Sequence, residues 1–363
     1  MTTKSIRCTG LCLGLLLLAD GSLQPAAQQS NSRILVNVVL VQLNVAVTDR
    51  KGNYITGLRP ENFAIMEDKI PETISSFEEG GEPESGAIDA EQPGSGSNEG
   101  ASRPKVENSL NGSKLPPAPP QAGANVFILF DTSDFMYRGF VFAQDAIAGF
   151  VRSMSNTDKI AFYSYSRDLS RSTALTSNHS LVMNAVRSTV AGDEAALYNC
   201  LLLTVRDAAQ LRGRKAIVVF SNGPDNASSV PPEDVEELAQ STGTIIYIIS
   251  TRAAEDDPLS TAVFERMSKA TGGKAYFSKS WRDETLAFRS IRDDLVHLYT
   301  ITYYPKPNNN RGWRTISVKL VGKDLEKYRV RTRDGYQVLQ QAAASSNLPS
   351  PQRPELDPKS PSH

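Results

Sequence analysis

Residues 126–135 read VFILFDTSDF, and this stretch decides the fold. Its five leading apolar residues are typical of a strand that is covered on both faces, as in a parallel sheet flanked by helices. Asp131 and Ser133 come just beyond the carboxyl end of that strand, where ligands bind in such sheets. A carboxylate and a hydroxyl at this spacing suit a hard cation such as Mg²⁺ or Mn²⁺. The alternative is an Asp/Ser turn that braces its own loop or caps the next helix.

The segments that follow alternate between helix and strand, as a doubly wound α/β architecture requires. Two further apolar runs, residues 216–220 and 244–249, predict buried strands. Shorter strands are predicted at residues 159–165 and 274–277, and helices at residues 137–154, 179–190, 195–211, 233–241, 259–270 and 283–295. Together these elements predict one α/β domain with a mostly parallel sheet over residues 123–296.

Three short segments of this domain carry a resemblance to a known family. They are residues 131–135 (DTSDF), residues 195–199 (AALYN) and residues 221–226 (SNGPDN). Their order resembles the von Willebrand factor type A domain, whose pattern reads Asp-x-Ser-x-Ser, then Thr before Ala-Leu-Tyr-Asp, then Asp-Gly-x-Asp-Asn. The whole chain resembles the secreted acidobacterial proteins with a "VWFA-related" domain, which end in Arg-x-Gly-Tyr, here residues 333–336.

The resemblance implies a metal-dependent adhesion site at Asp131 and Ser133, but three ligand positions depart from the family pattern. Phe135 stands at the second serine, Ala195 at the threonine and Asn222 at the final aspartate. Phe and Ala supply no side-chain oxygen, and Asn supplies only a neutral carbonyl. A divalent ion held by one certain carboxylate is poorly compensated for its lost hydration. We therefore expect a degenerate site, and rearranged ligands would have to come from Asp134, Asp193, Glu194 and Asp225.

The leading functional hypothesis is a secreted, non-enzymatic binding module that recognises a protein or extracellular surface partner without a full metal site. The expected partner-binding face comprises Asp131, Ser133, Asp134, Phe135, Ala195, Asn222 and Asp225. The alternatives are a structural or assembly component of the cell envelope with an inert loop face, and a metal-dependent binder with rearranged acidic ligands. The balance of 39 basic and 40 acidic residues argues against nucleic acid as a partner,.

An enzymatic function is not expected, and no small-molecule substrate is inferred. The three histidines have no metal-ligand spacing to one another or to Cys200,. The sequence also contains no Gly-x-Ser-x-Gly elbow, no phosphate-binding Gly-x-x-x-x-Gly-Lys loop and no Cys-x-x-Cys,. Cys200 is expected to be a small buried core residue, because lone thiols on helices usually are.

Residues 1–27 predict a signal peptide, and therefore an exported protein that is periplasmic or secreted. Lys4 and Arg7 precede an apolar run at residues 11–19 that is too short to span a bilayer comfortably,. Cleavage near residue 27 would remove Cys8 and Cys12. The alternative is an uncleaved N-terminal anchor.

Two β-rich segments flank the α/β domain. Residues 33–78 contain a half-buried strand around residues 43–47, and residues 297–340 contain predicted strands at 299–304, 315–321 and 328–338. Because neither segment can bury a core alone, we expect them to pair into one β-sandwich-like unit, with the α/β domain inserted between them. Two independent small sheets are the alternative. Residues 79–122 and 341–363, which are rich in Pro, Gly and Ser, predict a disordered linker and a disordered tail,.

Overall fold

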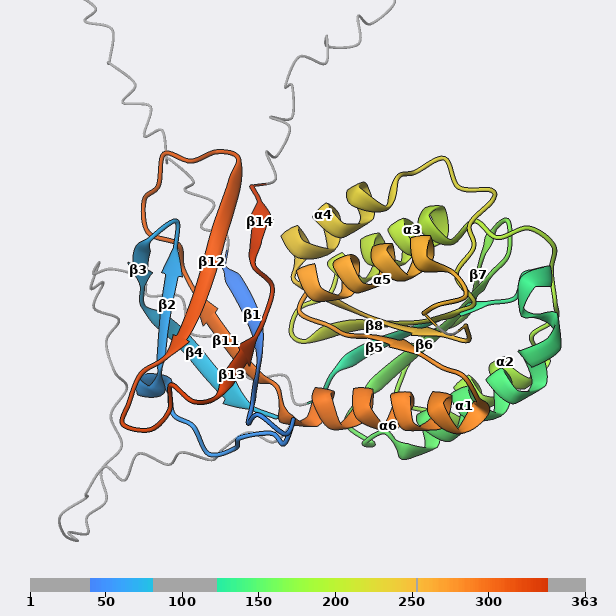
Figure 1. Ribbon diagram of the computed structural model, residues 1–363, viewed down its shortest axis with the longest axis horizontal. Coiled ribbons are helices and arrows are strands. Elements are labelled where there is room, and N and C mark those ends of the chain that lie inside the picture. The colour runs from blue at the N-terminus through green and yellow to red at the C-terminus, as the bar shows by residue number, and fades with distance from the viewer. Residues whose placement is uncertain (1–39, 81–122, 253, 339–363) are drawn as a thin grey trace, which may run out of the picture. The chain divides into compact units, whose positions relative to one another are not determined.

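In the computed structural model, which describes residues 40–80, 123–252 and 254–338, a six-stranded sheet forms the centre of the α/β domain (Figure 1). The strand order is β10-β9-β8-β5-β6-β7. The strands are β5 (Asn125–Asp131), β6 (Lys159–Tyr165), β7 (Leu169–Thr176), β8 (Lys215–Ser221), β9 (Thr244–Ser250) and β10 (Ala275–Phe277). All neighbouring pairs are parallel except β6 with β7. The expected doubly wound, mostly parallel fold is confirmed.

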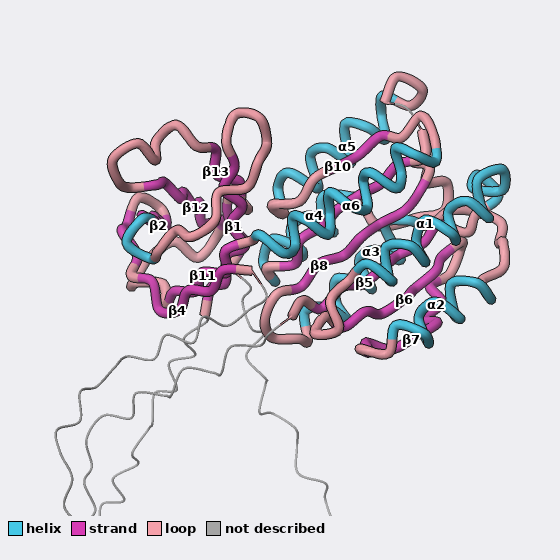
Figure 2. The backbone as a smooth tube through the Cα atoms, turned by 90° about the horizontal axis from the view of Figure 1, so that it is seen from below, coloured by secondary structure: helices cyan, strands magenta, loops and turns pink. Residues whose placement is uncertain are grey.

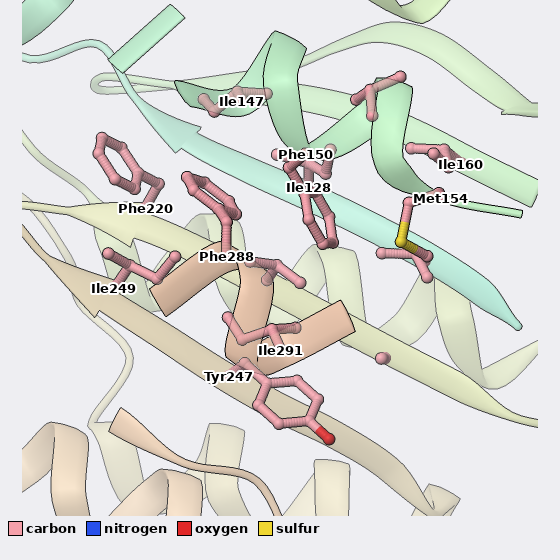
Figure 3. Close-up of a cluster of buried hydrophobic side chains, with 14 of the residues drawn as sticks. Ile128, Ile147, Phe150, Met154, Ile160, Phe220, Tyr247, Ile249, Phe288 and Ile291 are labelled. Atoms are coloured by element: carbon pink, nitrogen blue, oxygen red, sulfur yellow. The ribbon is translucent and has the colours of Figure 1, made fainter. Parts of the chain in front are cut away.

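Helices cover both faces of this sheet (Figure 1). One face carries α1 (Phe140–Ser153), α2 (His179–Ser188) and α6 (Trp281–His297), and the other carries α3 (Leu197–Ala209), α4 (Pro232–Thr242) and α5 (Pro258–Ala270). Figure 3 shows the core under α1 and α6, where the Phe288 ring lies 5.0 Å from Phe150 and 5.5 Å from Phe220. The apolar runs of β5, β8 and β9 are buried because helices pack on both of their faces,.

Two elements of the domain differ from the sequence prediction. The strand β7 was not predicted: it is an antiparallel edge strand whose residues are half-buried or exposed, so it carries no apolar signal,. The helix expected from residue 137 begins instead as a 3₁₀ helix, η2 (Asp134–Gly139), and becomes α-helical only at Phe140.

The flanking β segments form two four-stranded sheets around a common core (Figure 2). The N-terminal segment supplies β1 (Val41–Thr48), β2 (Phe63–Glu67), β3 (Ile70–Glu72) and β4 (Ile74–Glu79), with the 3₁₀ helix η1 (Pro60–Asn62) before β2. The C-terminal segment supplies β11 (Tyr299–Tyr303), β12 (Trp313–Leu320), β13 (Arg329–Arg331) and β14 (Gly335–Gln337). The sheet orders are β13-β1-β11-β4 and β14-β12-β2-β3, so each sheet mixes strands from both segments. The expected sandwich-like unit is confirmed.

Two expectations about this unit are corrected. The strand β1 is not half-buried: Asn44 and Ala46 on its second face are buried too, and Ala46 belongs to the core cluster of α1 and α6. The single strand expected over residues 328–338 is divided into β13 and β14, which lie in different sheets.

The chain changes sheets at Arg333, whose guanidinium is buried. It donates to the carbonyls of Gln42 and Gln240 and lies 5.3 Å from the centre of the Tyr336 ring. At the neighbouring Gly335, any side chain would meet the Trp313 ring at 2.5 Å. The Arg-x-Gly-Tyr ending therefore joins β1, α4 and the sandwich core, and only glycine fits at its third position.

A buried carboxylate, Asp294 on α6, joins the α/β domain to the sandwich. It accepts hydrogen bonds from the hydroxyls of Tyr54 and Tyr247, both at 2.6 Å, and from the guanidinium of Arg331, and Lys274 lies 3.7 Å away. Burial alone would raise the pKa of Asp294, but the charges of Arg331 and Lys274 and the two hydroxyls outweigh it and hold the pKa below its ordinary value,.

Several sequence predictions lie outside the described residues. They are the signal peptide, the disordered linker and the disordered tail, apart from Glu79 and Gly80, which continue β4 and its hydrogen bonding. The domain boundaries stay predictions. None of the helices within the described ranges is long and apolar enough to cross a membrane.

Replacing Arg331 with Ala should destabilise the protein strongly, because it leaves the buried Asp294 carboxylate without its main countercharge. We expect urea unfolding at pH 7 to show a loss of about 3–5 kcal/mol. The matched control is Arg266→Ala, which breaks the surface ion pairs with Glu233 and Glu236 and should cost about 0–1 kcal/mol. Equal losses for the two variants would contradict the role given to Asp294.

Glu284 has a raised pKa, in contrast to the lowered pKa of Asp294, and it therefore makes the fold less stable as pH rises. Burial, together with the neighbouring charge of Asp283, raises the pKa of Glu284 from 4.5 to about 7. A raised carboxyl pKa means that the folded state prefers the protonated form, so this group lowers stability as pH rises from 4.5 to about 7,. We expect Glu284→Gln to flatten this part of the curve of unfolding free energy against pH. Glu265→Gln, an exposed carboxyl on α5, is the control and should leave the curve unchanged.

Candidate functional site

Three loops meet at the carboxyl end of the parallel sheet. We call residues 132–139, 191–196 and 222–229 together the loop face. The Asp134 amide donates to the Asp193 carbonyl at 2.8 Å, and the Ala195 amide donates to Asn226 Oδ1 at 2.9 Å. The Asn222 side-chain amide donates to the Phe135 carbonyl at 2.6 Å. The structure therefore brings together all three segments that the sequence singled out.

Asp131 lies under this face with both carboxylate oxygens engaged. Its Oδ1 accepts from the Ser133 amide at 2.9 Å, and its Oδ2 accepts from the Ser221 hydroxyl at 2.7 Å. Ser221 in turn accepts from the Tyr165 hydroxyl at 3.1 Å. Burial raises the pKa of Asp131, and the hydrogen bonds from Ser133 and Ser221 oppose that rise,. The carboxyl thus braces the ends of β5, β6 and β8.

Two side-chain oxygens of the loop face have no hydrogen-bond partner. The Ser133 hydroxyl and Asn222 Oδ1 are both buried and make no hydrogen bond. A buried polar atom without a partner costs about 1–3 kcal/mol. Both atoms lie beneath the surface of the loop face, since Ser133 is 0% and Asn222 is 5% exposed.

The other expected positions have structural contacts of their own. Asp225 accepts from the Tyr198 amide at 3.0 Å, which caps the start of α3, and from the Ser228 amide at 2.9 Å. Ala195 is buried, and both its amide and its carbonyl bond to the loop that follows β8. Asp134 is exposed. Asp225 and Ala195 hold the loops in place, whereas Asp134 faces solvent.

The residues present do not fit the divalent cation that the type A family implies. No group of three or more His, Cys, Asp or Glu side chains is placed to hold a metal among residues 40–80, 123–252 and 254–338. Both Asp131 oxygens already accept hydrogen bonds, and Phe135 offers only a backbone carbonyl that Asn222 occupies. Mg²⁺ and Mn²⁺ need several oxygen ligands and compensation of two charges. The acids proposed as substitutes do not assemble: Glu194 pairs with Arg167 at 3.3 Å.

Large exposed apolar side chains lie in and next to the loop face. The sequence prediction included Phe135 but missed Tyr137, Val141 and Phe142. Tyr137 is 76% exposed and Phe142 is 59% exposed, and Phe135 and Val141 are exposed as well. The stretch of residues 135–142, FMYRGFVF, is apolar without a single helical period, and this excess was the available signal,. A group of large exposed apolar side chains is typical of a protein interaction surface.

No family model matches the chain, and no curated protein matches it. Among solved structures, it is similar to BatB from Bacteroides thetaiotaomicron, with 16% identity, a TM-score of 0.41 and coverage of 47% of this chain and 98% of that one. A von Willebrand factor type A protein from Catenulispora acidiphila matches with 10% identity, a TM-score of 0.40 and coverage of 60% and 66%.

The vWF domain of the type V pili tip protein Mfa5 from Porphyromonas gingivalis matches with 11% identity, a TM-score of 0.41 and coverage of 47% and 94%. These likenesses concern the fold alone. The strand order, the helices on both faces and the three loops are the arrangement expected of a von Willebrand type A domain. Membership of the acidobacterial group stays a prediction.

Asp131 should matter for folding through its hydrogen bonds and not through its charge. In Asp131→Ala the Ser133 amide and the Ser221 hydroxyl lose their acceptor, so we expect a loss of about 1–3 kcal/mol in unfolding free energy. Asp131→Asn keeps one of the two acceptor oxygens and removes a buried charge, so its unfolding free energy should fall less than that of Asp131→Ala at pH 7. A larger loss for Asn than for Ala in urea titrations would contradict this assignment.

Proposed function

We propose that the chain is an exported, non-enzymatic binding protein whose type A domain recognises a protein or surface partner through its loop face, without a divalent cation. The observation that carries this proposal is the group of exposed apolar side chains at one edge of the sheet. Tyr137 and Phe142 supply most of this apolar area. Ser133 and Asn222 lie buried beneath it, each with a side-chain oxygen that makes no hydrogen bond.

This group of side chains matches the composition of protein interfaces. Aromatic anchors supply most of the binding energy in such surfaces, and a few polar groups fix the orientation of the partner. A partner that contributes hydrogen bonds and apolar area needs no bridging ion.

The network around Asp131 supports the metal-free form of the proposal. The same loops that would surround an ion are held together by side-chain and backbone hydrogen bonds, among them the bond from Asn222 to Phe135. Asn222 donates there through an amide nitrogen, which an aspartate lacks. The departure from the family pattern thus supplies a contact that holds the loops without an ion.

Site-specific photo-crosslinking tests the partner-binding face. A crosslinker in place of Tyr137 should capture a partner from the cell envelope or the culture fluid of the source organism. The control position is Leu181, which is also exposed but lies at the start of α2, near the amino end of the sheet. Capture from position 137 and not from 181 is the expected result. Capture from neither position would favour an inert loop face and an assembly role.

Chelation tests the absence of a metal. We expect calorimetric titration of the full chain with Mg²⁺ or Mn²⁺ to give no binding heat, and crosslinking from position 137 to survive EDTA. Asp131→Asn should behave like the parent in both measurements. Crosslinking that EDTA abolishes and Mg²⁺ restores would show a metal-dependent binder instead.

A further inference from the structure

A groove of about 520 Å³ runs between α1 and α6, on the outer side of the core drawn in Figure 3. Phe150 and Phe288 form its floor, and Phe142 and Trp281 stand at the end nearer the carboxyl edge of the sheet. Trp281 is 56% exposed. The groove is therefore an apolar, aromatic-lined surface that the described residues leave uncovered.

A glycine in this groove has no explanation in the described fold. Gly149 lies in the interior of α1, where glycine is less favourable for a helix than alanine. A Cβ at this position would meet no atom closer than 3.9 Å, and that atom is the end of the Arg152 side chain. Packing within the fold therefore gives no reason for a glycine at this position. A molecule or segment that approached the α1 backbone closely would give one, because any larger residue would block that approach.

Residues 81–122 leave and re-enter the described structure at one end of this groove. Gly80 donates its amide to the Leu298 carbonyl, just after α6, and the amide of Ala124 donates to Asp158, in the loop after α1. Arg214 joins the two points, because its guanidinium donates to the Gly80 carbonyl and its own carbonyl accepts from the Asn125 amide. The ends of the segment thus lie beside the C-terminal ends of the two helices that form the groove.

The sequence of this segment matches the groove in chemistry and in length. Residues 115–120 read LPPAPP, and proline-rich segments bind aromatic-lined grooves as extended polyproline II helices. Six such residues cover about 19 Å at 3.1 Å each. The groove spans about 16 Å from Phe142 to Ser153 at the α-helical rise of 1.5 Å per residue.

Charge favours the same occupant. Residues 82–91, which follow Gly80 at the end of α6, contain four acidic residues and no basic one. Arg289 and Arg292 line the α6 side of the groove, where Arg292 also pairs with Asp293, and Asp145 lines the α1 side. We propose that residues 115–120 of the chain bind in cis along the groove between α1 and α6, packed against Trp281, Phe142 and the backbone at Gly149. This interaction is independent of the proposed partner binding at the loop face.

Trypsin cleavage of the purified full chain tests the proposal with an internal control. Lys114 directly precedes the proline-rich stretch, whereas Lys105 lies nine residues upstream of Lys114. Gly149→Leu fills the groove with a residue that favours helix, so the domain should remain folded by circular dichroism. We expect the rate of cleavage at Lys114 relative to Lys105 to rise roughly tenfold in this variant if the segment is bound nine-tenths of the time. An unchanged ratio in a folded variant would overturn the proposal.

Trp281 fluorescence gives a second readout. With Trp313→Phe as the background, Trp281 is the one tryptophan in the chain. Replacing residues 115–120 with Gly and Ser at the same length should raise acrylamide quenching of Trp281 roughly twofold, because the occupant would cover the exposed part of the ring. Leu259→Ala, an exposed position on α5 over the other face of the sheet, should leave quenching unchanged.

The same measurements distinguish other occupants. Shielding of Trp281 that increases with protein concentration would assign the groove to a second copy of the chain and overturn the cis interaction. Shielding that appears only after envelope proteins are added would assign it to a partner and overturn it equally. Shielding that is independent of concentration and lost with residues 115–120 supports the proposal.

Discussion

The buried carboxylate of Asp294 connects parts of the chain that are far apart in sequence. Its oxygens accept from Tyr54 in the N-terminal segment, from Tyr247 in the central sheet and from Arg331 in the C-terminal segment. Taking a carboxylate out of water is costly unless a countercharge and hydrogen bonds replace the lost hydration. All of these replacements arrive only when the sandwich and the α/β domain are both folded. The charge therefore makes the two parts of the structure depend on one another.

Hydrogen bonds within the chain also hold the loop face together. The type A pattern implies loops held by an ion, but here Asp131 receives its hydrogen bonds from Ser133 and Ser221, and Asn222 donates to Phe135. The loops thus keep their arrangement through contacts within the chain. The Ser133 hydroxyl and Asn222 Oδ1 remain the unsatisfied atoms. The same loops leave Tyr137 exposed, so apolar area lies on the same edge.

The sequence predicts most of the fold because burial on both faces of β5, β8 and β9 demands continuous apolar runs. It does not reveal β7, because an edge strand with half-exposed side chains has no such demand. The loss of metal ligands at Phe135, Ala195 and Asn222 can also be read directly. The contacts that replace them cannot, because they depend on where the backbone lies: the Asn222 amide bonds to the Phe135 carbonyl, 87 residues away. The sequence likewise cannot show that the glycine at position 149 is unexplained by packing, because that depends on the open space around it in the fold.

The insertion of the type A domain between the two halves of the sandwich has a mechanical consequence. Tension applied between Val41 and Gln337 acts first on the antiparallel pairs that join β1 to β11 and β13. The chain enters and leaves the α/β domain between β4 and β11, and these two strands are hydrogen-bonded to each other, so their pairing holds the two ends of the domain together. The loop face would therefore keep its geometry under load until the sandwich opens.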